Sequence, residues 1–511
     1  MKEQNRLATW VNSKYYPLLL FFVSFVFVTL FSRSTSFLYL FEGSDPSVFK
    51  QMGRAILKGK TLYIDYFDNK GCLLYFLHAL GLRMGGNFVL LLMQTLSLTA
   101  TLVIWDQMLA LYRNQSERLI CLGIALFLLL CFYGAGDQTQ EWCLPFISYP
   151  LLVYFRAYKT KTDIPPLQML VIGLCFGIIT FVQINNACAF LGFLAYLWIQ
   201  YLMKKDFGKL LQSVGCFIAG WVIVAIPCLL YFYVQAGWHG IYEMAYASLL
   251  SNFEYLNNQW RTRPVHILIY ALLLLTFITF TLIIAKRKKE IVIPIILSFL
   301  LFVGTFGRLC NSFYFLALLP LYIVLMMIID GSQNRRMLKI LSGITLLGLT
   351  FYAGNTMKDL LFQNSKEKNN YGNFHHCINN IPENERDSIY NYNLYWHGTH
   401  MMEHEGLLQC NRVLFTSLVF TLPTLWKEET SKPVHPPKWI LVSFEKQIKK
   451  GDTYFIIENY DLCCSFQYDN QYLQKPQIGE TFEIRLYRRK DQMPSLEEAT
   501  DYEQTTSVPT L

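Results

Sequence analysis

The sequence predicts an α-helical polytopic membrane protein that carries a small α/β domain at its C-terminal end. Of its 511 residues, 53% are hydrophobic and only 16% are charged, and so little charge would not cover the surface of a soluble protein of this length. Long apolar runs recur as far as residue 356, with basic residues between them. Because this placement explains the net charge of +8 through membrane topology, we expect no binding to nucleic acid.

About eleven segments are long and apolar enough to cross a bilayer, which takes roughly 20 helical residues. They lie at roughly 16–39, 87–112, 119–136, 142–158, 167–184, 187–203, 210–236, 265–285, 291–307, 312–330 and 338–356. The first is longer than the apolar core of a signal peptide and lacks a clean cleavage site, so we expect an uncleaved span. One long kinked segment is the alternative for 167–203, but Asn185-Asn186 at its centre favours a tight hairpin.

The basic residues predict the orientation of these spans. They fall in alternate loops, which with the N-terminus form one cytoplasmic set: 113–118, 159–161, 204–209, 286–289 and 335–339. The opposite set contains 40–86, 137–141, 185–186, 237–264, 308–311 and everything after 357. We therefore expect residues 1–356 to form a transmembrane domain with its N-terminus inside the cell, and residues 357–511 to form an extracytoplasmic domain.

The first external loop, 40–86, is expected to be structured. Apolar residues recur at helical spacing between Ser47 and Lys58, while Lys50 and Arg54 lie with Lys58 on the other face. This pattern is typical of an amphipathic helix at the membrane interface. A second helix of this kind is expected over 72–84.

Several carboxylates lie at the outer ends of the predicted spans, where such groups are costly and are usually retained for a task. Asp45 precedes Pro46 at the start of the first loop helix, so capping that helix is an alternative to chemistry. Asp65 and Asp68 flank an aromatic turn, and they suit turn formation as well as substrate binding. Glu141 is a candidate contact to a sugar or an acceptor, with a helix cap as the alternative.

This side of the membrane has no ATP, so a transferase there needs a donor made inside and flipped across. A sugar on a polyprenyl phosphate is the natural one. The reaction requires a carboxylate to take a proton from the acceptor, cations to hold the leaving phosphate and an apolar groove for the lipid. Asp45 is the candidate base, and Lys70 and Arg308 are the candidate phosphate ligands.

Three motifs add a family resemblance. The first is Asp-Pro-Ser-Val-Phe at 45–49, followed by Gly-Lys-x-x-Tyr-x-Asp-x-Phe-Asp-Asn-Lys-Gly at 59–71. The others are Gln-Glu-x-x-Leu-Pro-Phe at 140–146 and Gly307-Arg308 with Phe313-Tyr314. Together they resemble loop motifs of the bacterial GT-C glycosyltransferases, the group that contains protein mannosyltransferases and the aminoarabinose transferase of lipid A.

The resemblance implies a hexosyl- or pentosyltransferase of the bacterial cytoplasmic membrane with a GT-C-like fold. It would move a sugar from a polyprenyl-phosphate donor to an extracytoplasmic glycan, lipid or protein by inversion, with Asp45 as the base. Pro46 stands where many members have a second acidic residue, so an Asp-x-Asp metal site is unsupported and no cofactor is expected. Two further departures are Cys72 in place of a common proline and Ser312 in place of a frequent histidine.

A transporter or flippase of a lipid-linked sugar is the alternative function. Transporters place ionisable residues near the bilayer midplane and often contain inverted repeats of broken helices. This sequence has neither feature, because its charges gather at the outer ends of the spans. The enzyme is therefore the favoured hypothesis.

The tail predicts a small α/β domain, with strands at 439–442, 454–457 and 482–487. Four of its cysteines are able to form disulfides outside the cell, but the sequence does not give the pairing: Cys377, Cys410, Cys463 and Cys464. Its histidines His397, His400 and His404 suggest zinc, but they lack the spacing of a common zinc motif.

Overall fold

A computed structural model of the chain describes most of the predicted spans and much of the tail. The described residues are 15–40, 44–133, 136–251, 289–306, 312–328, 347, 354, 368–392, 395–410, 412, 437–444, 459–469 and 481–490.

The chain divides into two compact units. The first consists of Met1–Asn364 and Arg412–Glu428, and the second of Ser365–Asn411 and Glu429–Leu511. The predicted boundary after 356 falls among residues outside the description. The first unit also takes in Arg412, which the sequence places in the tail.

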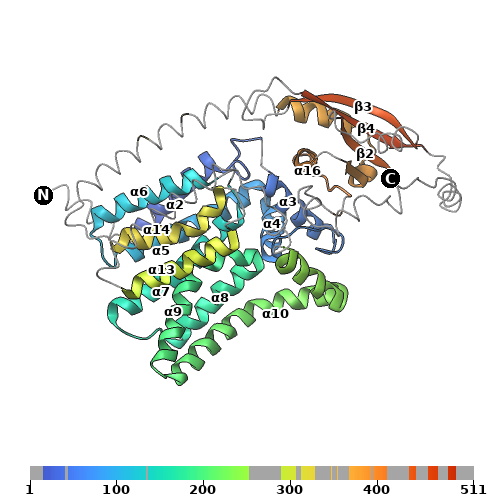
Figure 1. Ribbon diagram of the computed structural model, residues 1–511. Coiled ribbons are helices and arrows are strands. Elements are labelled where there is room, and N and C mark those ends of the chain that lie inside the picture. The colour runs from blue at the N-terminus through green and yellow to red at the C-terminus, as the bar shows by residue number, and fades with distance from the viewer. Residues whose placement is uncertain are drawn as a thin grey trace, which may run out of the picture. The chain divides into compact units, whose positions relative to one another are not determined.

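The described part of the first unit is a bundle of helices (Figure 1). They are α2 (Tyr16–Phe31), α3 (Ser44–Leu57), α4 (Cys72–Gly85), α5 (Asn87–Leu109), α6 (Gln115–Phe132), α7 (Thr139–Thr160), α8 (Pro166–Gln183), α9 (Cys188–Met203), α10 (Phe207–Ala245), α13 (Lys289–Phe306) and α14 (Leu319–Ile328). Short helical turns adjoin some of them: η1 (Ile184–Ala187) lies between α8 and α9, η2 (Tyr246–Leu250) follows α10, and η3 (Ser312–Leu318) precedes α14. Every predicted span among the described residues overlaps one of these helices, whereas 265–285 and most of 338–356 lie outside the description.

Among the described residues, four helical stretches are long and apolar enough to cross a membrane: Asn87–Leu109, Gln115–Phe132, Pro166–Met203 and Phe207–Leu250. The outer face of α10 carries exposed apolar side chains, among them Leu211, Ile226 and Val234, as a lipid-facing helix would. In contrast, α7 packs against both α5 and α8 and buries most of its side chains. The chain is therefore mostly helical with membrane character, and the count of about eleven spans stays a prediction.

The predicted hairpin between 167–184 and 187–203 is present. Gln183 ends α8 with an extended backbone (φ −167°), and η1 leads into α9. At the far end of α9, the Tyr201 hydroxyl donates to Asp163, which precedes α8, over 3.4 Å. Lys209 of α10 forms an ion pair with the same carboxylate at 2.8 Å. The end of α9 therefore lies beside the start of α8, as a hairpin requires.

Other contacts bring the predicted cytoplasmic loops together at one end of the bundle. Asp106 of α5 accepts a hydrogen bond from Tyr16 of α2 at 3.3 Å and pairs with Arg118 of α6 at 2.9 Å. Arg113 donates to the carbonyl oxygen of Met326 in α14 at 2.7 Å. The starts of α2 and α6 therefore lie close to the end of α5, and the end of α14 lies beside them, whereas the membrane topology stays a prediction.

The basic face predicted for the first loop helix is only partly exposed. Lys50 is fully buried, and its ammonium group donates to the carbonyl oxygen of Ser34 at 2.7 Å. The prediction of an outward-facing Lys50 was wrong because α3 packs against α4 inside the unit. Lys58, just past the end of the helix, is exposed.

The described part of the second unit contains a sheet of four strands in the order β1-β2-β4-β3. Its strands are β1 (Ile389–Tyr392), β2 (Trp439–Phe444), β3 (Tyr460–Asp469) and β4 (Thr481–Arg489). The pairing of β1 with β2 is parallel, and the other pairings are antiparallel. The predicted strands at 439–442 and 482–487 lie in β2 and β4, whereas 454–457 lies outside the described residues.

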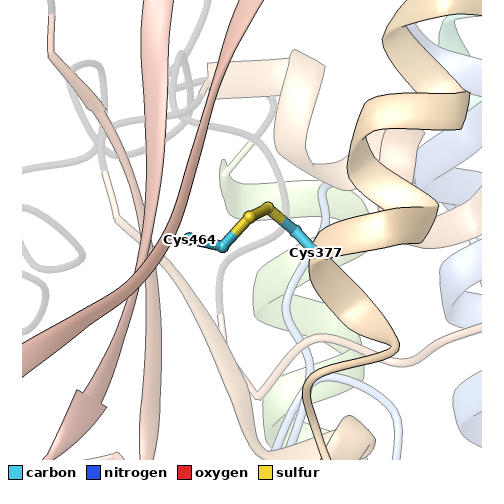
Figure 2. The surroundings of a disulfide bond; sticks show 2 residues. All are labelled: Cys377 and Cys464. Carbon is cyan, nitrogen blue, oxygen red and sulfur yellow. A yellow bond between two sulfur atoms is a disulfide. The ribbon is translucent and has the colours of Figure 1, made fainter.

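A disulfide between Cys377 and Cys464 ties a helix of this unit, 368–378, to β3 (Figure 2). The two other tail cysteines, Cys410 and Cys463, lie on the surface and outside this disulfide. The structure thus supplies the pairing that the sequence left open.

Candidate functional site

The loop from Lys58 to Gly71, between α3 and α4, is folded tightly onto itself. Tyr63 has a left-handed backbone (φ 67°), which is rare for a bulky side chain and is tolerated only where the surroundings enforce it. Its amide donates to the carbonyl oxygen of Tyr66 at 2.6 Å, and its hydroxyl donates to the carbonyl oxygen of Lys70 at 2.8 Å. Tyr63 therefore joins the two halves of the loop.

Gly71 anchors the end of this loop against α8. Its amide donates to the carbonyl oxygen of Val182 at 2.9 Å. A Cβ atom at position 71 would lie 2.1 Å from the carbonyl oxygen of Phe181, closer than atoms can approach. Only glycine therefore allows the loop to close here, and the backbone just before it carries Lys70.

Tyr75 of α4 positions two of the predicted site residues. Its hydroxyl donates to the carboxylate of Asp68 at 2.6 Å and accepts a hydrogen bond from the amide of Lys70 at 3.2 Å. Asp68 is buried, whereas the half-buried Lys70 side chain donates to Asn69 at 2.5 Å. Sequence reasoning did not single out Tyr75, whose only signal was its position on the helix after the motif.

The structure brings Asp45 into the same charged group. Asp45 lies half-buried in the first turn of α3, within electrostatic reach of both Lys70 and Asp68. Burial raises the pKa of the Asp45 carboxyl above its ordinary value, Lys70 lowers it, and Asp68 raises it further. The net pKa is raised, so this carboxylate holds a proton more readily than an exposed aspartate would.

Asp65 lies apart from this group. It is exposed, its carboxylate accepts a hydrogen bond from the amide of Thr61 at 2.7 Å, and its own amide donates to the carbonyl oxygen of Thr61 at 2.9 Å. These contacts favour the turn-forming alternative for Asp65.

Glu141 is buried in a network that joins several helix ends. Its carboxylate accepts hydrogen bonds from Gln94 at 2.8 Å, from the Tyr133 hydroxyl at 2.7 Å and from the Asp137 amide at 2.9 Å. Because protein groups occupy both oxygens, the arrangement favours a structural role over a substrate contact. Binding of a sugar or an acceptor by Glu141 stays a prediction.

Asp137 is a buried acid beside this network that sequence reasoning missed. It has a left-handed backbone (φ 58°), and His78 Nε2 lies 3.1 Å from both of its carboxylate oxygens. The carboxylate also accepts hydrogen bonds from Ser34 and Trp142, each at 2.8 Å. The sequence signal that could have identified Asp137 is its position as an acid in a short loop between two predicted spans. The same kind of position pointed to Asp45.

These partners keep the carboxyl of Asp137 ionised. Burial raises its pKa, but His78, the nearby Lys50 and Ser34 lower it by more, so the net pKa lies below the ordinary value. Asp137 thus differs from Asp45, whose net pKa is raised. Its filled hydrogen-bonding capacity suits a fixed counter-charge rather than a proton acceptor.

Two further sequence predictions concern phosphate and metal binding. Arg308 lies outside the described residues, so its role as a phosphate ligand stays a prediction. Within the part of the chain that the structure describes, no cluster of three or more His, Cys, Asp or Glu residues is placed to hold a metal ion. In the second unit, the ring of His404 stacks on Tyr371 with 3.8 Å between centroids, and the same tyrosine hydrogen-bonds to His400.

Comparison with protein-family models finds none that matches the chain, and no curated protein matches it either. Among solved structures, it is similar to the oligosaccharyltransferase of Archaeoglobus fulgidus, crystallised tethered via a disulfide bond with an acceptor peptide containing the NVT sequon. The alignment covers 93% of this chain and 74% of the other, with 12% identity and a TM-score of 0.47. A likeness at this level carries no conclusion about the activity of this chain, which has to follow from its own residues.

Proposed function

We propose that this protein is a membrane glycosyltransferase that moves a sugar from a polyprenyl-phosphate donor to an extracytoplasmic acceptor with inversion. The observation that carries the proposal is the grouping of Asp45, Asp68 and Lys70 on the structured loop after the first predicted span. A carboxylate with a raised pKa beside a cation supplies the general base and the phosphate ligand that such a transfer requires.

In the proposed reaction, Asp45 takes the proton from an acceptor hydroxyl as its oxygen attacks the anomeric carbon. The bond from that carbon to the phosphate oxygen breaks, and the phosphate leaves with the electron pair. Lys70 and Arg308 stabilise the charge on the leaving phosphate, so that we expect no cofactor. Attack from the face opposite the phosphate inverts the anomeric centre.

The acceptor is proposed to be a glycan, lipid or protein outside the cytoplasmic membrane of a bacterium. The Cys377–Cys464 disulfide supports an extracytoplasmic tail, since such bonds persist in oxidising compartments. The apolar faces of the bundle supply the surface along which a polyprenyl chain would lie. The identity of the sugar is left to experiment.

The proposal is tested by incubating purified protein with polyprenyl-phosphate sugars and measuring release of polyprenyl phosphate. Asp45→Asn keeps the size of the side chain but cannot take up the proton, so turnover should fall by about two orders of magnitude or more. Asp65→Asn is the matched control, because it changes an exposed turn residue of the same loop.

Near wild-type turnover in Asp45→Asn would show that Asp45 only caps its helix. Donor that crosses the bilayer of a vesicle without release of polyprenyl phosphate would favour the flippase instead.

A further inference from the structure

Arg412 is far from the first external loop in sequence, but it contacts the middle of that loop. Its guanidinium donates to two successive backbone carbonyls, that of Tyr63 at 3.1 Å and that of Ile64 at 2.9 Å. Its own carbonyl oxygen accepts a hydrogen bond from the amide of Phe67 at 2.7 Å, and its guanidinium lies 5.9 Å from the centre of the Phe67 ring. Arg412 therefore contacts the residues on both sides of the turn.

These contacts lie at the residue of the loop that has a left-handed backbone. Tyr63 has the left-handed backbone, and its carbonyl group is one of the two that Arg412 binds. The hydroxyl of the same tyrosine donates to the carbonyl oxygen of Lys70 at 2.8 Å. A short chain of contacts thus runs from Arg412 through Tyr63 to the backbone of Lys70.

The ion pair with Glu243 does not account for this arrangement. Arg412 Nη2 lies 3.5 Å from the Glu243 carboxylate, and the Arg412 side chain is 29% exposed. A partly exposed pair at this distance contributes little. The planar guanidinium, in contrast, offers donors in a fixed fork that reaches two carbonyl groups together, whereas the lysine ammonium is a point charge.

We propose that Arg412 is a positioning residue that holds the loop 58–71 in the conformation that presents Lys70 to the phosphate of the donor. This rests on the proposed function for the role of Lys70, whereas the hold on the loop stands independently of it. Arg412 itself touches neither donor nor acceptor in this proposal.

The test compares Arg412→Lys with two controls in the full-length protein in lipid nanodiscs. Arg386→Lys alters another half-buried arginine that donates to a backbone carbonyl, that of Ile381 at 3.2 Å. Glu243→Gln removes the carboxylate charge and leaves the carbonyl contacts of Arg412 in place. Tyr63→Phe removes only the hydroxyl that holds Lys70, and it gives a second, milder route to the same effect.

Two readouts separate the hold on the loop from catalysis. Losing one or two hydrogen bonds of this kind should speed amide hydrogen exchange in the peptide 61–71 about tenfold in Arg412→Lys. The apparent KM for the lipid-linked sugar should rise by about tenfold in Arg412→Lys and by less in Tyr63→Phe, with kcat at saturating donor within about twofold of wild type. Neither control should change either readout.

Unchanged exchange in Arg412→Lys would overturn the proposal, as would a loss of kcat without a change in KM. Faster exchange in Arg412→Lys and in neither of the two controls would support the hold on the loop even if the wild-type protein released no polyprenyl phosphate. In that case the proposed function would fall and the positioning role of Arg412 would stand.

Discussion

Burial and two neighbouring charges set the proton affinity of Asp45. Burial raises its pKa, Lys70 opposes the rise and Asp68 adds to it. A general base has to be deprotonated, so activity should fall as the pH drops through this raised pKa. The acid limb of the pH–activity profile should therefore lie above the ordinary pKa of aspartate. Lys70→Gln removes the opposing charge and should move the acid limb to higher pH, whereas Lys70→Arg should leave it in place.

The measurement is the pH profile of kcat/KM. The pH at which kcat/KM falls to half its maximum does not depend on the maximum itself, so a variant with low activity can still be compared. An acid limb that stays in place in Lys70→Gln would separate Asp45 from Lys70 and remove the basis for treating them as one site.

The Asp137–His78 pair predicts an effect on stability. Asp137→Asn should remove the buried carboxylate that pairs with His78 and lies near Lys50, and breaking a buried pair in this way costs about 3–5 kcal/mol. Because the pKa of Asp137 is lowered in the folded protein, this contribution is present above the unfolded pKa of about 3.9. It is lost as the pH falls through the folded value.

Thermal unfolding in detergent measures this effect. Asp163→Asn is the control, since its pair with Lys209 is about half exposed and its loss should barely change the unfolding temperature. Equal unfolding temperatures for the two variants would mean that Asp137 is not the counter-charge that its contacts indicate.

Residue types and motif spacing pointed to Asp45, Asp68 and Lys70, which the structure groups together. They did not distinguish Asp65, because a turn former and a substrate ligand look alike until the hydrogen bond to Thr61 is seen. The role of Arg412 could not be predicted from the sequence for a different reason. A contact between residues so far apart in sequence leaves no local pattern, and a lone arginine in a polar tail carries no signal.

At the scale of elements, hydrophobic runs locate the helices well, because length and apolarity are what a bilayer demands. The face that a helix buries is harder to predict. Lys50 lies on the polar side of the periodic pattern in α3, yet the structure buries it, since a backbone carbonyl and the nearby Asp137 compensate its charge. Periodicity alone cannot anticipate a partner supplied by another element.

The close approach of the first external loop to α8 gives an element-scale prediction. Gly71→Ala places a methyl group where the carbonyl oxygen of Phe181 lies, so the loop and α8 have to separate. Overpacking of this kind costs about 1–3 kcal/mol, and the displacement should reduce turnover by moving Lys70.

Gly123→Ala in α6 is the matched control, because a Cβ there meets nothing within 4 Å. Alanine in a helix interior should leave stability unchanged or raise it by up to about 1 kcal/mol. Wild-type turnover and unfolding temperature in Gly71→Ala would contradict the close packing of this loop.

At the scale of the whole molecule, the functional proposal depends on which side of the membrane each end of the bundle faces. The contacts of Asp106 join the ends of α2, α5 and α6, and those of Asp163 join the start of α8 to α10; the basic residues predict that these loops face the cytoplasm. The first external loop and the end of α8, which meet at Gly71, belong to the opposite set. A disulfide in the second unit fits an oxidising compartment outside the cytoplasm.

Reporter fusions test this topology directly. A fusion after Leu511 should report an extracytoplasmic position, and fusions in the basic loops should report cytoplasmic ones, namely after Lys161, Lys205, Lys288 and Arg335. Alkylation of intact cells before reduction should find Cys377 and Cys464 blocked in a disulfide, and Cys463 open to a membrane-impermeant reagent. A cytoplasmic report from Leu511 would mean that one span is miscounted. Arg308 would then lie across the membrane from Asp45, and the two could not act on one donor.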